Sequence, residues 1–229
     1  LEALVAGDLA SIRFISRLLS WVFPYLSLDW MVREFRVNLA KELDFVQEAE
    51  SAERTRAFFA DDRRIAVPRI FQQQSTRRVL TMEYIDGIRV DDVDMLVKAG
   101  IDPSDVAKEV VDAFGKMVFV SGFVHCDGHS GNMLVRSRSQ QRGDFELFLL
   151  DHGLYRELDE KFRKAFCRLW RGLVLRRSEE VERACADLGA PGFSNLFSIF
   201  LLNRSWSSAK HVGVDLRKKM TKDEIRVLV

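Results

Sequence analysis

The sequence predicts an α+β fold, because helical and strand-like patterns occupy different stretches of the chain. Apolar residues recur at three- and four-residue intervals near both ends, a spacing that is typical of amphipathic helices. Short runs of β-branched and aromatic residues, bounded by polar or glycine-containing turns, lie between residues 65 and 150 and predict strands. We therefore expect a small group of strands with helices before and after them.

Length, composition and charge limit the classes of protein that this chain can represent. A chain of 229 residues forms one large domain or two lobes. Its residues are 47% hydrophobic and 30% charged, which suits a filled core and a solvated surface. The net charge of +1 gives no reason to expect nucleic-acid binding. The three cysteines are odd in number and lack C-x-x-C spacing, so a reducing compartment fits better than a disulfide framework or a structural zinc site.

No stretch of the sequence predicts a membrane-spanning helix. Such a helix needs roughly 18 or more consecutive apolar residues, and Arg17 and Pro24 interrupt the nearest candidate, residues 14–28. The sequence begins at Leu1, inside a helical pattern, and shows no signal or transit peptide. We therefore expect a fragment or a processed chain, whose location a missing targeting segment does not reveal.

Two helices are expected before the first strand. Residues 1–23 form an amphipathic pattern that a proline then stops. Residues 29–60 form a longer pattern. Its acids Glu42, Glu48 and Glu50 cannot all share one face at about 100° per residue, so some face solvent and others can face a site.

Residues 65–71 and 78–84 predict two strands joined by a polar turn. The second strand leads into Glu83, Tyr84 and Ile85, followed by an Asp-Gly pair. In a kinase-like fold this segment would be the hinge, where backbone groups of Glu83 and Ile85 can pair with adenine. A strand followed by Asp-Gly is also an ordinary turn, so this segment does not decide the function alone.

The rest of the chain predicts one more hairpin and five helices. Ser104 is the expected N-cap of the second of these helices, and a polar loop separates the two strands of the hairpin. In order, the elements are helices at 91–100 and 104–121, strands at 134–135 and 146–150, and helices at 159–175, 179–188 and 193–203.

Three polar residues stand at loop positions beside the strands of this hairpin. Asp127 and Asn132 lie five residues apart in the loop before the first strand, and Asp151 directly follows the second. Gly128 and Gly131 let the loop backbone approach a phosphate closely. The order helix, D-x-x-x-x-N, strand, turn, strand, D-x-G is that of a phosphotransferase site. In such a site one acid handles the acceptor hydroxyl, and an amide and a second acid hold Mg²⁺ on the ATP phosphates.

A metal site is the alternative for the same loop. His125, Cys126, Asp127 and His129 could ligate a metal, and the spacing between the two histidines would suit zinc on a helix. The glycines argue against a helix there, and this alternative leaves the following amide and the D-x-G motif unexplained. We expect instead that His125 packs inward and hydrogen-bonds the backbone near Asp151.

Four ordered motifs resemble those of the UbiB/aarF-domain atypical kinases, a protein-kinase-like family tied to ubiquinone biosynthesis and to mitochondrial or plastid lipid homeostasis. The resemblance covers nearly the whole chain, and L-D-H-G-L-Y at its D-x-G motif resembles a mitochondrial branch distinct from the coenzyme Q kinase. The family patterns are K/E-E-L-D-F/Y-x-x-E-A-x-N-A at residues 41–52, V-L-x-M-E-x-I-x-G at 79–87, F-x-H-x-D-P-H-P-G-N at 123–132 and L-L-D-x-G at 149–153.

This resemblance implies an atypical, UbiB-like kinase fold with a truncated small lobe (1–82) and a mainly helical large lobe (83–229), and it implies ATP and Mg²⁺ as cofactors. It also implies a role for each matching residue. Asp127 would be the catalytic-loop acid, and Asn132 and Asp151 would be the Mg²⁺ ligands. Glu48 would be the helix acid that pairs with the nucleotide-binding lysine, and Glu42 and Asp44 would be the E-x-D acids that pair with a lysine of an N-terminal K-x-G-Q extension. The adenine hinge would be formed by Glu83, Tyr84 and Ile85.

Two departures from the family pattern bear on activity. Gly128 and Ser130 replace both prolines of the catalytic loop, so we expect a more flexible loop. The K-x-G-Q segment, the alanine-rich nucleotide loop and the strand with the nucleotide lysine are expected before Leu1. Lys41 cannot replace that lysine, because it lies on the same predicted helix as Glu48.

Two functions therefore remain open: an ATP-dependent kinase or ATPase, and a non-catalytic kinase-like module that binds a partner or a lipid. A small-molecule kinase resembling the aminoglycoside phosphotransferases would share the site logic but would not need the acids Glu42, Asp44 and Glu48. The acceptor is open among a protein, a lipid, a ubiquinone precursor and water. The resemblance also suggests a mitochondrial location and association with a membrane.

Overall fold

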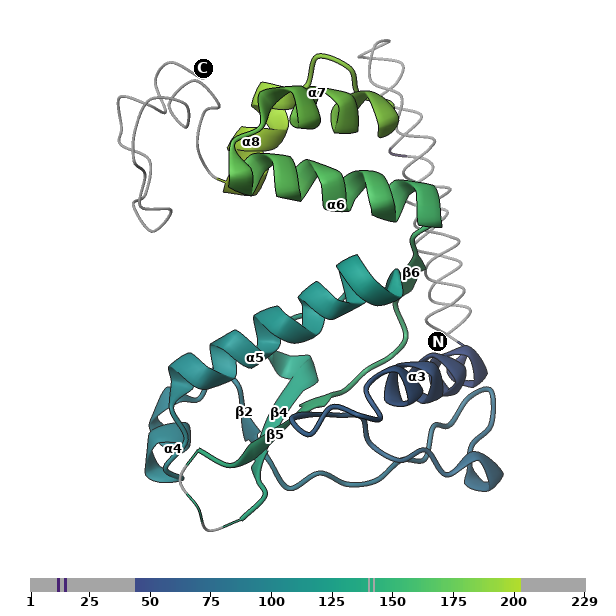
Figure 1. The fold of residues 1–229 in the computed structure, drawn as a ribbon. Coiled ribbons are helices and arrows are strands. Elements are labelled where there is room, and N and C mark those ends of the chain that lie inside the picture. The colour runs from purple at the N-terminus through teal and green to yellow at the C-terminus, as the bar shows by residue number, and fades with distance from the viewer. Residues whose placement is uncertain (1–11, 13–14, 16–43, 140, 142, 203–229) are drawn as a thin grey trace. The chain divides into compact units, whose positions relative to one another are not determined.

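The computed structural model describes residues 12, 15, 44–139, 141 and 143–202 of the chain (Figure 1). It divides into two compact units. The first unit holds the described residues up to Phe114 and those from His125 to Arg156, and the second holds Gly115–Val124 and the residues from Glu157 onward. Apart from residues 12 and 15, the helix expected at 1–23 lies outside the described residues, as do the start of the next helix and Glu42. The lobe boundary at residue 82 stays a prediction.

Helix α3 (Phe45–Phe58) opens the well-described part of the first unit. Asp44 has an extended backbone, and its carboxylate accepts a hydrogen bond from the Val46 N–H at 3.2 Å, as an N-cap does. The continuous helix expected at 29–60 is therefore wrong at Asp44, because this residue caps the helix instead of continuing it. Glu48, Ala52 and Thr55 are buried on one face of α3, as the helical period requires.

A four-stranded sheet lies at the centre of the first unit, in the order β1-β5-β4-β2. The expected hairpin is confirmed as β4 (Met133–Ser137) and β5 (Phe145–Leu149), which pair antiparallel with Met133 opposite Leu149. Strand β1 (Ile65–Ala66) runs parallel to β5, and β2 (Ile88–Arg89) runs antiparallel to β4. This register places the loop before β4 and the turn after β5 at the same end of the hairpin.

The two strands expected at 65–71 and 78–84 form only in part. Beyond β1, the two segments meet through an isolated antiparallel bridge between Ile70 and Met82, and η1 (Gln72–Gln74) fills the turn between them. Pro68 interrupts the first segment and has no N–H to donate to a ladder. Ile70 nevertheless packs with Val67, Leu80 and the alanines of α3, so the segment still forms part of the core.

Helices α4 (Val93–Lys98) and α5 (Pro103–Lys116) confirm the two helices expected between the hinge and the loop. The expected N-cap Ser104 is wrong, because α5 already begins at Pro103 and the Asp102 carboxylate accepts a hydrogen bond from the Ser104 N–H at 2.8 Å. Proline suits the first position of a helix, where its missing N–H has no partner to lose.

The second unit is mainly helical (Figure 1). The π-helix η2 (Met117–Ser121) ends at Gly122, whose φ of 71° is left-handed. Helices α6 (Glu160–Leu175), α7 (Ser178–Asp187) and α8 (Ser194–Leu202) confirm the last three expected helices. They enclose a core built on Leu169, Leu173 and Val181.

The chain passes between the two units at two short strands, β3 (Phe123–His125) and β6 (Tyr155–Glu157), which pair as a two-stranded sheet. No described helix is long and apolar enough to cross a bilayer.

Candidate active site

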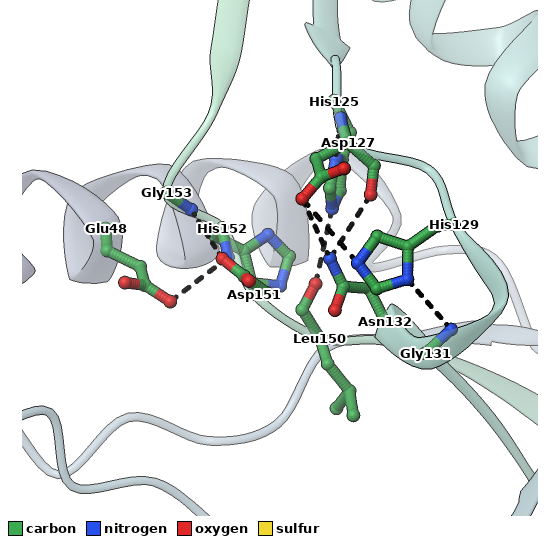
Figure 2. Close-up of polar contacts among 10 residues, drawn as sticks. All are labelled: Glu48, His125, Asp127, His129, Gly131, Asn132, Leu150, Asp151, His152 and Gly153. Atoms are coloured by element: carbon green, nitrogen blue, oxygen red, sulfur yellow. Dashed lines mark hydrogen bonds and ion pairs between the residues drawn. The ribbon is translucent and has the colours of Figure 1, made fainter. Parts of the chain in front are cut away.

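The loop between β3 and β4 brings Asp127 and Asn132 together (Figure 2). The Asn132 side chain is 8% exposed, and its amide nitrogen donates to the Asp127 carbonyl oxygen at 3.2 Å and to Oδ2 of the same residue at 3.4 Å. The Asp127 side chain is half exposed, and the His129 ring lies 3.7 Å from its Oδ2. The carboxylate is therefore held from two sides and still reaches solvent, as an acid that meets a substrate must.

Asp151 meets this loop across the end of the β4–β5 hairpin. The Leu150 N–H donates to the Asn132 carbonyl at 2.8 Å, which ties the residue before Asp151 to the loop. The backbone of Asp151 has φ = 50°, a left-handed conformation that a non-glycine residue seldom adopts. Such a conformation costs on the order of 1 kcal/mol or more and persists only where neighbouring contacts hold it.

Glu48 reaches the same place from helix α3 (Figure 2). Its carboxylate accepts a hydrogen bond from the His152 N–H at 3.2 Å, although the two residues lie 104 positions apart. A side chain built on Gly153 would lie 3.3 Å from the Asp151 carboxylate and 3.8 Å from that of Glu48, so the absence of a side chain leaves room for both acids. Burial, and then the nearby Asp151 charge, raise the pKa of Glu48.

These acids line one hollow of the first unit, with a volume of about 320 Å³. Its walls are Phe45, Glu48, Asp127, Asp151, Gly153 and Leu154. The donors that line the hollow are carboxylate oxygens, and the Asn132 amide lies against the Asp127 carboxylate. Hard oxygen ligands of this kind suit Mg²⁺ better than a transition metal.

Two buried histidines, His125 and His152, bond to backbone carbonyls that precede Asp151 (Figure 2). The carbonyl of Leu150 lies 3.2 Å from Nε2 of His125, and Nδ1 of that ring accepts the Asp127 N–H at 3.1 Å. Because a carbonyl only accepts, Nε2 carries the proton and the ring is neutral. Burial lowers the pKa of His125 and so favours the same neutral state. The expected contact of His125 with the backbone near Asp151 is confirmed.

The alternative metal site does not assemble from its four residues. Nδ1 of His125 is already an acceptor for a backbone N–H, and Nδ1 of His129 accepts the Gly131 N–H at 3.0 Å. The segment is not helical either, since it passes from β3 into a short 3₁₀ turn, η3 (Ser130–Asn132). The spacing of the histidines therefore does not bring their free nitrogens to one centre.

The positions that depart from the two family prolines have contacts of their own. A Cβ atom on Gly128 would lie 2.6 and 2.7 Å from ring atoms of Phe114, so this ring occupies the space that a side chain would need. The Ser130 hydroxyl donates to the Asp91 carboxylate at 2.6 Å, and Arg89 holds the same carboxylate at 2.7 Å. The hydrogen bond from Arg89, and then that from Ser130, lower the pKa of Asp91 to about 2.

Replacing Gly128 by alanine should destabilise the protein by about 1–3 kcal/mol, the usual cost of overpacking. The reason is the Phe114 ring, because the backbone of Gly128 is not left-handed. In a Phe114→Leu background, which frees space, the cost of Gly128→Ala should be smaller. Urea unfolding of the wild type, the two single variants and the double variant measures this coupling, and equal costs in both backgrounds would contradict it.

The expected hinge residues, Glu83, Tyr84 and Ile85, lie in the segment that leads to β2. The Glu83 N–H donates to the Arg69 carbonyl at 2.8 Å, so this group is not free for adenine. The Ile85 side chain is buried and that of Tyr84 is exposed, and no recorded hydrogen bond among the described residues uses the Ile85 N–H. A Cβ on Gly87 would lie 3.0 Å from Cβ of Leu134, so glycine allows the hinge to pass close to β4.

Asp44 lies at the start of α3, where its carboxylate also pairs with Arg77 at 3.2 Å. Its expected partner, a lysine of an N-terminal extension, stays a prediction. Three further residues belong to the site and were not expected from their own patterns: His152, Thr55 and Tyr155. The seven-residue spacing of Glu48 and Thr55, two helical turns on one face, was the available signal for Thr55.

A larger hollow of about 670 Å³ lies in the second unit and contains none of the expected site residues. Arginines and acids of α6 and α7 line it, and they pair with one another, as in Arg168–Asp187 and Arg171–Glu180, both at 2.7 Å. The chemistry of the smaller hollow, rather than the size of this one, decides the candidate site.

Comparison with known proteins shows the family to which the chain belongs. The model of the ABC1 atypical kinase-like domain matches residues 1–185. The chain belongs to this family. It is 35% identical over 226 residues to AarF domain-containing protein kinase 1 of Gallus gallus, covering 99% of this chain and 43% of that protein. It is 34% identical over 223 residues to the probable serine/threonine-protein kinase abkD of Dictyostelium discoideum, covering 97% of this chain and 32% of that protein.

A solved structure supports the fold. A Mycobacterium tuberculosis protein, determined as a complex with erythromycin, superposes with a TM-score of 0.56 at 17% identity, over 79% of this chain and 44% of that chain. This ABC1-family chain spans less than half the length of both relatives. The kinase-like fold expected from the sequence is thereby confirmed.

Proposed function

We propose that this chain carries the metal-binding and phosphotransfer residues of an ATP-dependent atypical kinase or ATPase. The observation that carries the proposal is the convergence of Asp127, Asn132, Asp151 and Glu48, which come from three separate segments, on one end of the β4–β5 hairpin. An isolated acid in a loop is common, but hard oxygen donors gathered from three segments around one hollow suit Mg·ATP.

Each residue has a distinct proposed task. Asp127 is the acceptor base: its half-exposed carboxylate, oriented by the Asn132 amide, takes the hydroxyl proton of the acceptor as the phosphoryl group is transferred. Asn132 offers its amide oxygen and Asp151 its carboxylate as Mg²⁺ ligands, while the amide nitrogen of Asn132 stays bound to Asp127. Bound Mg²⁺ would neutralise charge on the phosphates.

Glu48 has the environment of an acid that awaits a cation. It is 7% exposed, it lies beside Asp151, and among the described residues no lysine or arginine forms an ion pair with it. Pairing with a nucleotide-binding lysine would return its pKa toward the ordinary value. Adenine would meet the hinge at Ile85, whose N–H is available, and at backbone groups of Glu83 and Tyr84.

The acceptor remains a class rather than a molecule: a protein, a lipid, a ubiquinone precursor or water. Resemblance to the UbiB/aarF family supports a role in ubiquinone biosynthesis or mitochondrial lipid homeostasis, with a mitochondrial location and contact with a membrane. Purified protein incubated with [γ-³²P]ATP and mitochondrial lipid or protein fractions would show which class is labelled.

The nucleotide site is tested by binding of Mg·ATP and Mg·ADP to the wild type and to Asp151→Asn. Ligand at 100 times its Kd should raise the unfolding free energy of the wild type by about 2.7 kcal/mol. The Asn variant should lose the Mg²⁺-dependent part of this gain, because it loses the charged ligand. Asp61→Asn makes the same chemical change at an exposed residue and serves as the control. Equal Mg·ATP binding by wild type and Asp151→Asn would contradict the assignment.

A non-catalytic kinase-like module is the second candidate, and the unpaired state of Glu48 among the described residues favours it. In that case Mg·ATP would bind, but neither hydrolysis nor phosphoryl transfer would follow. Measurable ATP turnover that Asp127→Asn abolishes would exclude this candidate.

A further inference from the structure

Both ring nitrogens of His152, the middle residue of the D-H-G motif, have hydrogen-bond partners. It is 3% exposed, its Nε2 lies 2.9 Å from the Leu149 carbonyl, and its Nδ1 lies 2.8 Å from the Tyr155 hydroxyl. A carbonyl only accepts, so Nε2 carries a proton. Burial favours the neutral ring, in which Nδ1 then accepts the Tyr155 hydroxyl proton.

The Tyr155 hydroxyl is itself oriented from helix α3. Thr55 is 2% exposed, and its hydroxyl lies 3.0 Å from that of Tyr155 across 100 positions of sequence. Because Tyr155 donates its proton to His152, Thr55 must be the donor in this contact. Burial raises the pKa of Tyr155, which keeps its proton in place. A directed chain thus runs from Thr55 through Tyr155 and His152 to the Leu149 carbonyl.

Helix α3 therefore contacts the D-H-G turn (residues 151–153) at two points. Glu48 accepts the backbone N–H of His152 at 3.2 Å, and Thr55, two helical turns later, holds the ring of the same residue through Tyr155. Both contacts lie on the buried face of α3. A rotation of His152 about its backbone would break both, so together they fix the residue that follows Asp151.

The left-handed backbone of Asp151 needs such contacts to hold it. With φ at 50°, Asp151 would relax to an ordinary conformation if its neighbour were free to turn. Relaxation would re-aim its carboxylate, which the proposed function uses as a metal ligand. Most of the contacts that oppose this are backbone contacts, but the link between Thr55 and Tyr155 is made by side chains alone and can be removed without changing the main chain.

We propose that Tyr155, oriented by Thr55, is a positioning residue for the cation site: it locks His152 to α3 and so keeps Asp151 in its left-handed conformation. This inference rests on the proposed function for its effect on nucleotide, but not for its effect on the D-H-G turn itself. Neither Tyr155 nor Thr55 is among the residues that line the hollow, and both connect to the D-H-G turn through His152.

The test uses Tyr155→Phe, which keeps the ring stacked on His152, and Thr55→Val, which keeps the shape of the side chain. Each should weaken Mg·ADP binding about tenfold in calorimetry, while ADP affinity in EDTA changes less than about twofold. Thr55→Ser restores the hydroxyl and should bind Mg·ADP as the wild type does. The double variant should be no weaker than either single variant, because both remove one chain of contacts.

A second readout needs no nucleotide. Hydrogen exchange of the His152 amide should accelerate at least about fivefold in Tyr155→Phe and Thr55→Val, and stay at the wild-type rate in Thr55→Ser. If the wild type binds no nucleotide, the proposed function is wrong and this exchange rate alone decides the lock. Folded variants with unchanged exchange overturn the inference, and so does an equal loss of ADP affinity with and without Mg²⁺.

Discussion

Replacing Asp127 by asparagine should slow phosphoryl transfer or ATP hydrolysis by at least about 100-fold, because an amide cannot accept the acceptor proton and general bases typically contribute about 10²–10⁴-fold. Binding of Mg·ATP should change little, since Asp127 is not one of the proposed metal ligands. An asparagine at this position also keeps an oxygen that can accept the hydrogen bond from the Asn132 amide at 3.4 Å. The expected signature is a fall in kcat with KM unchanged.

The measurement is steady-state ATP turnover of the purified protein, with Asp61→Asn as the matched control at an exposed site. Asp127→Glu, which keeps the charge but moves it by one methylene, should be intermediate, because positioning errors near 1 Å cost about 10²-fold. A loss of less than about tenfold in Asp127→Asn would mean that another group takes the proton or that none is needed.

Local sequence patterns predicted the elements that present this site. The β4–β5 hairpin and helices α6, α7 and α8 follow directly from apolar periodicity and turn residues, which depend on neighbours in sequence. The inward packing of His125 against the backbone near Asp151 was also expected, although the strand β3 that carries His125 was not. Such predictions succeed because the physical cause lies within a few residues of its effect.

The contacts that complete the site could not be read in this way. Thr55 and Tyr155 are 100 positions apart, and Glu48 and His152 are 104 apart. Each pair meets only because α3 packs beside the end of β5, and no local pattern encodes that packing. The same limit applies to Gly128, whose replacement of a family proline indicated a loose loop until the structure placed the Phe114 ring against it.

Lowering the pH should destabilise the metal-free protein through His152. Burial lowers the pKa of this histidine to about 4, despite its hydrogen bond to the Leu149 carbonyl. In the unfolded chain the pKa is about 6.5. Between pH values of about 4 and 6.5 the unfolded state therefore binds more protons than the folded state, and the free energy of unfolding decreases as the pH is lowered. The full contribution is present above pH of about 6.5, and about 3 kcal/mol is lost by pH of about 4.

His125 should act in the same direction, because burial lowers its pKa too. Glu48 opposes both histidines: its pKa is raised, so the folded state takes up this proton first and gains stability as the pH falls.

The variant His152→Asn separates the contribution of His152 from those of His125 and Glu48. Urea unfolding at pH 7.5 and pH 5 should show a loss in the wild type that is larger than in the variant by about 2 kcal/mol. Equal losses would mean that the His152 ring takes up a proton in the folded protein as readily as in the unfolded chain, and would contradict this prediction.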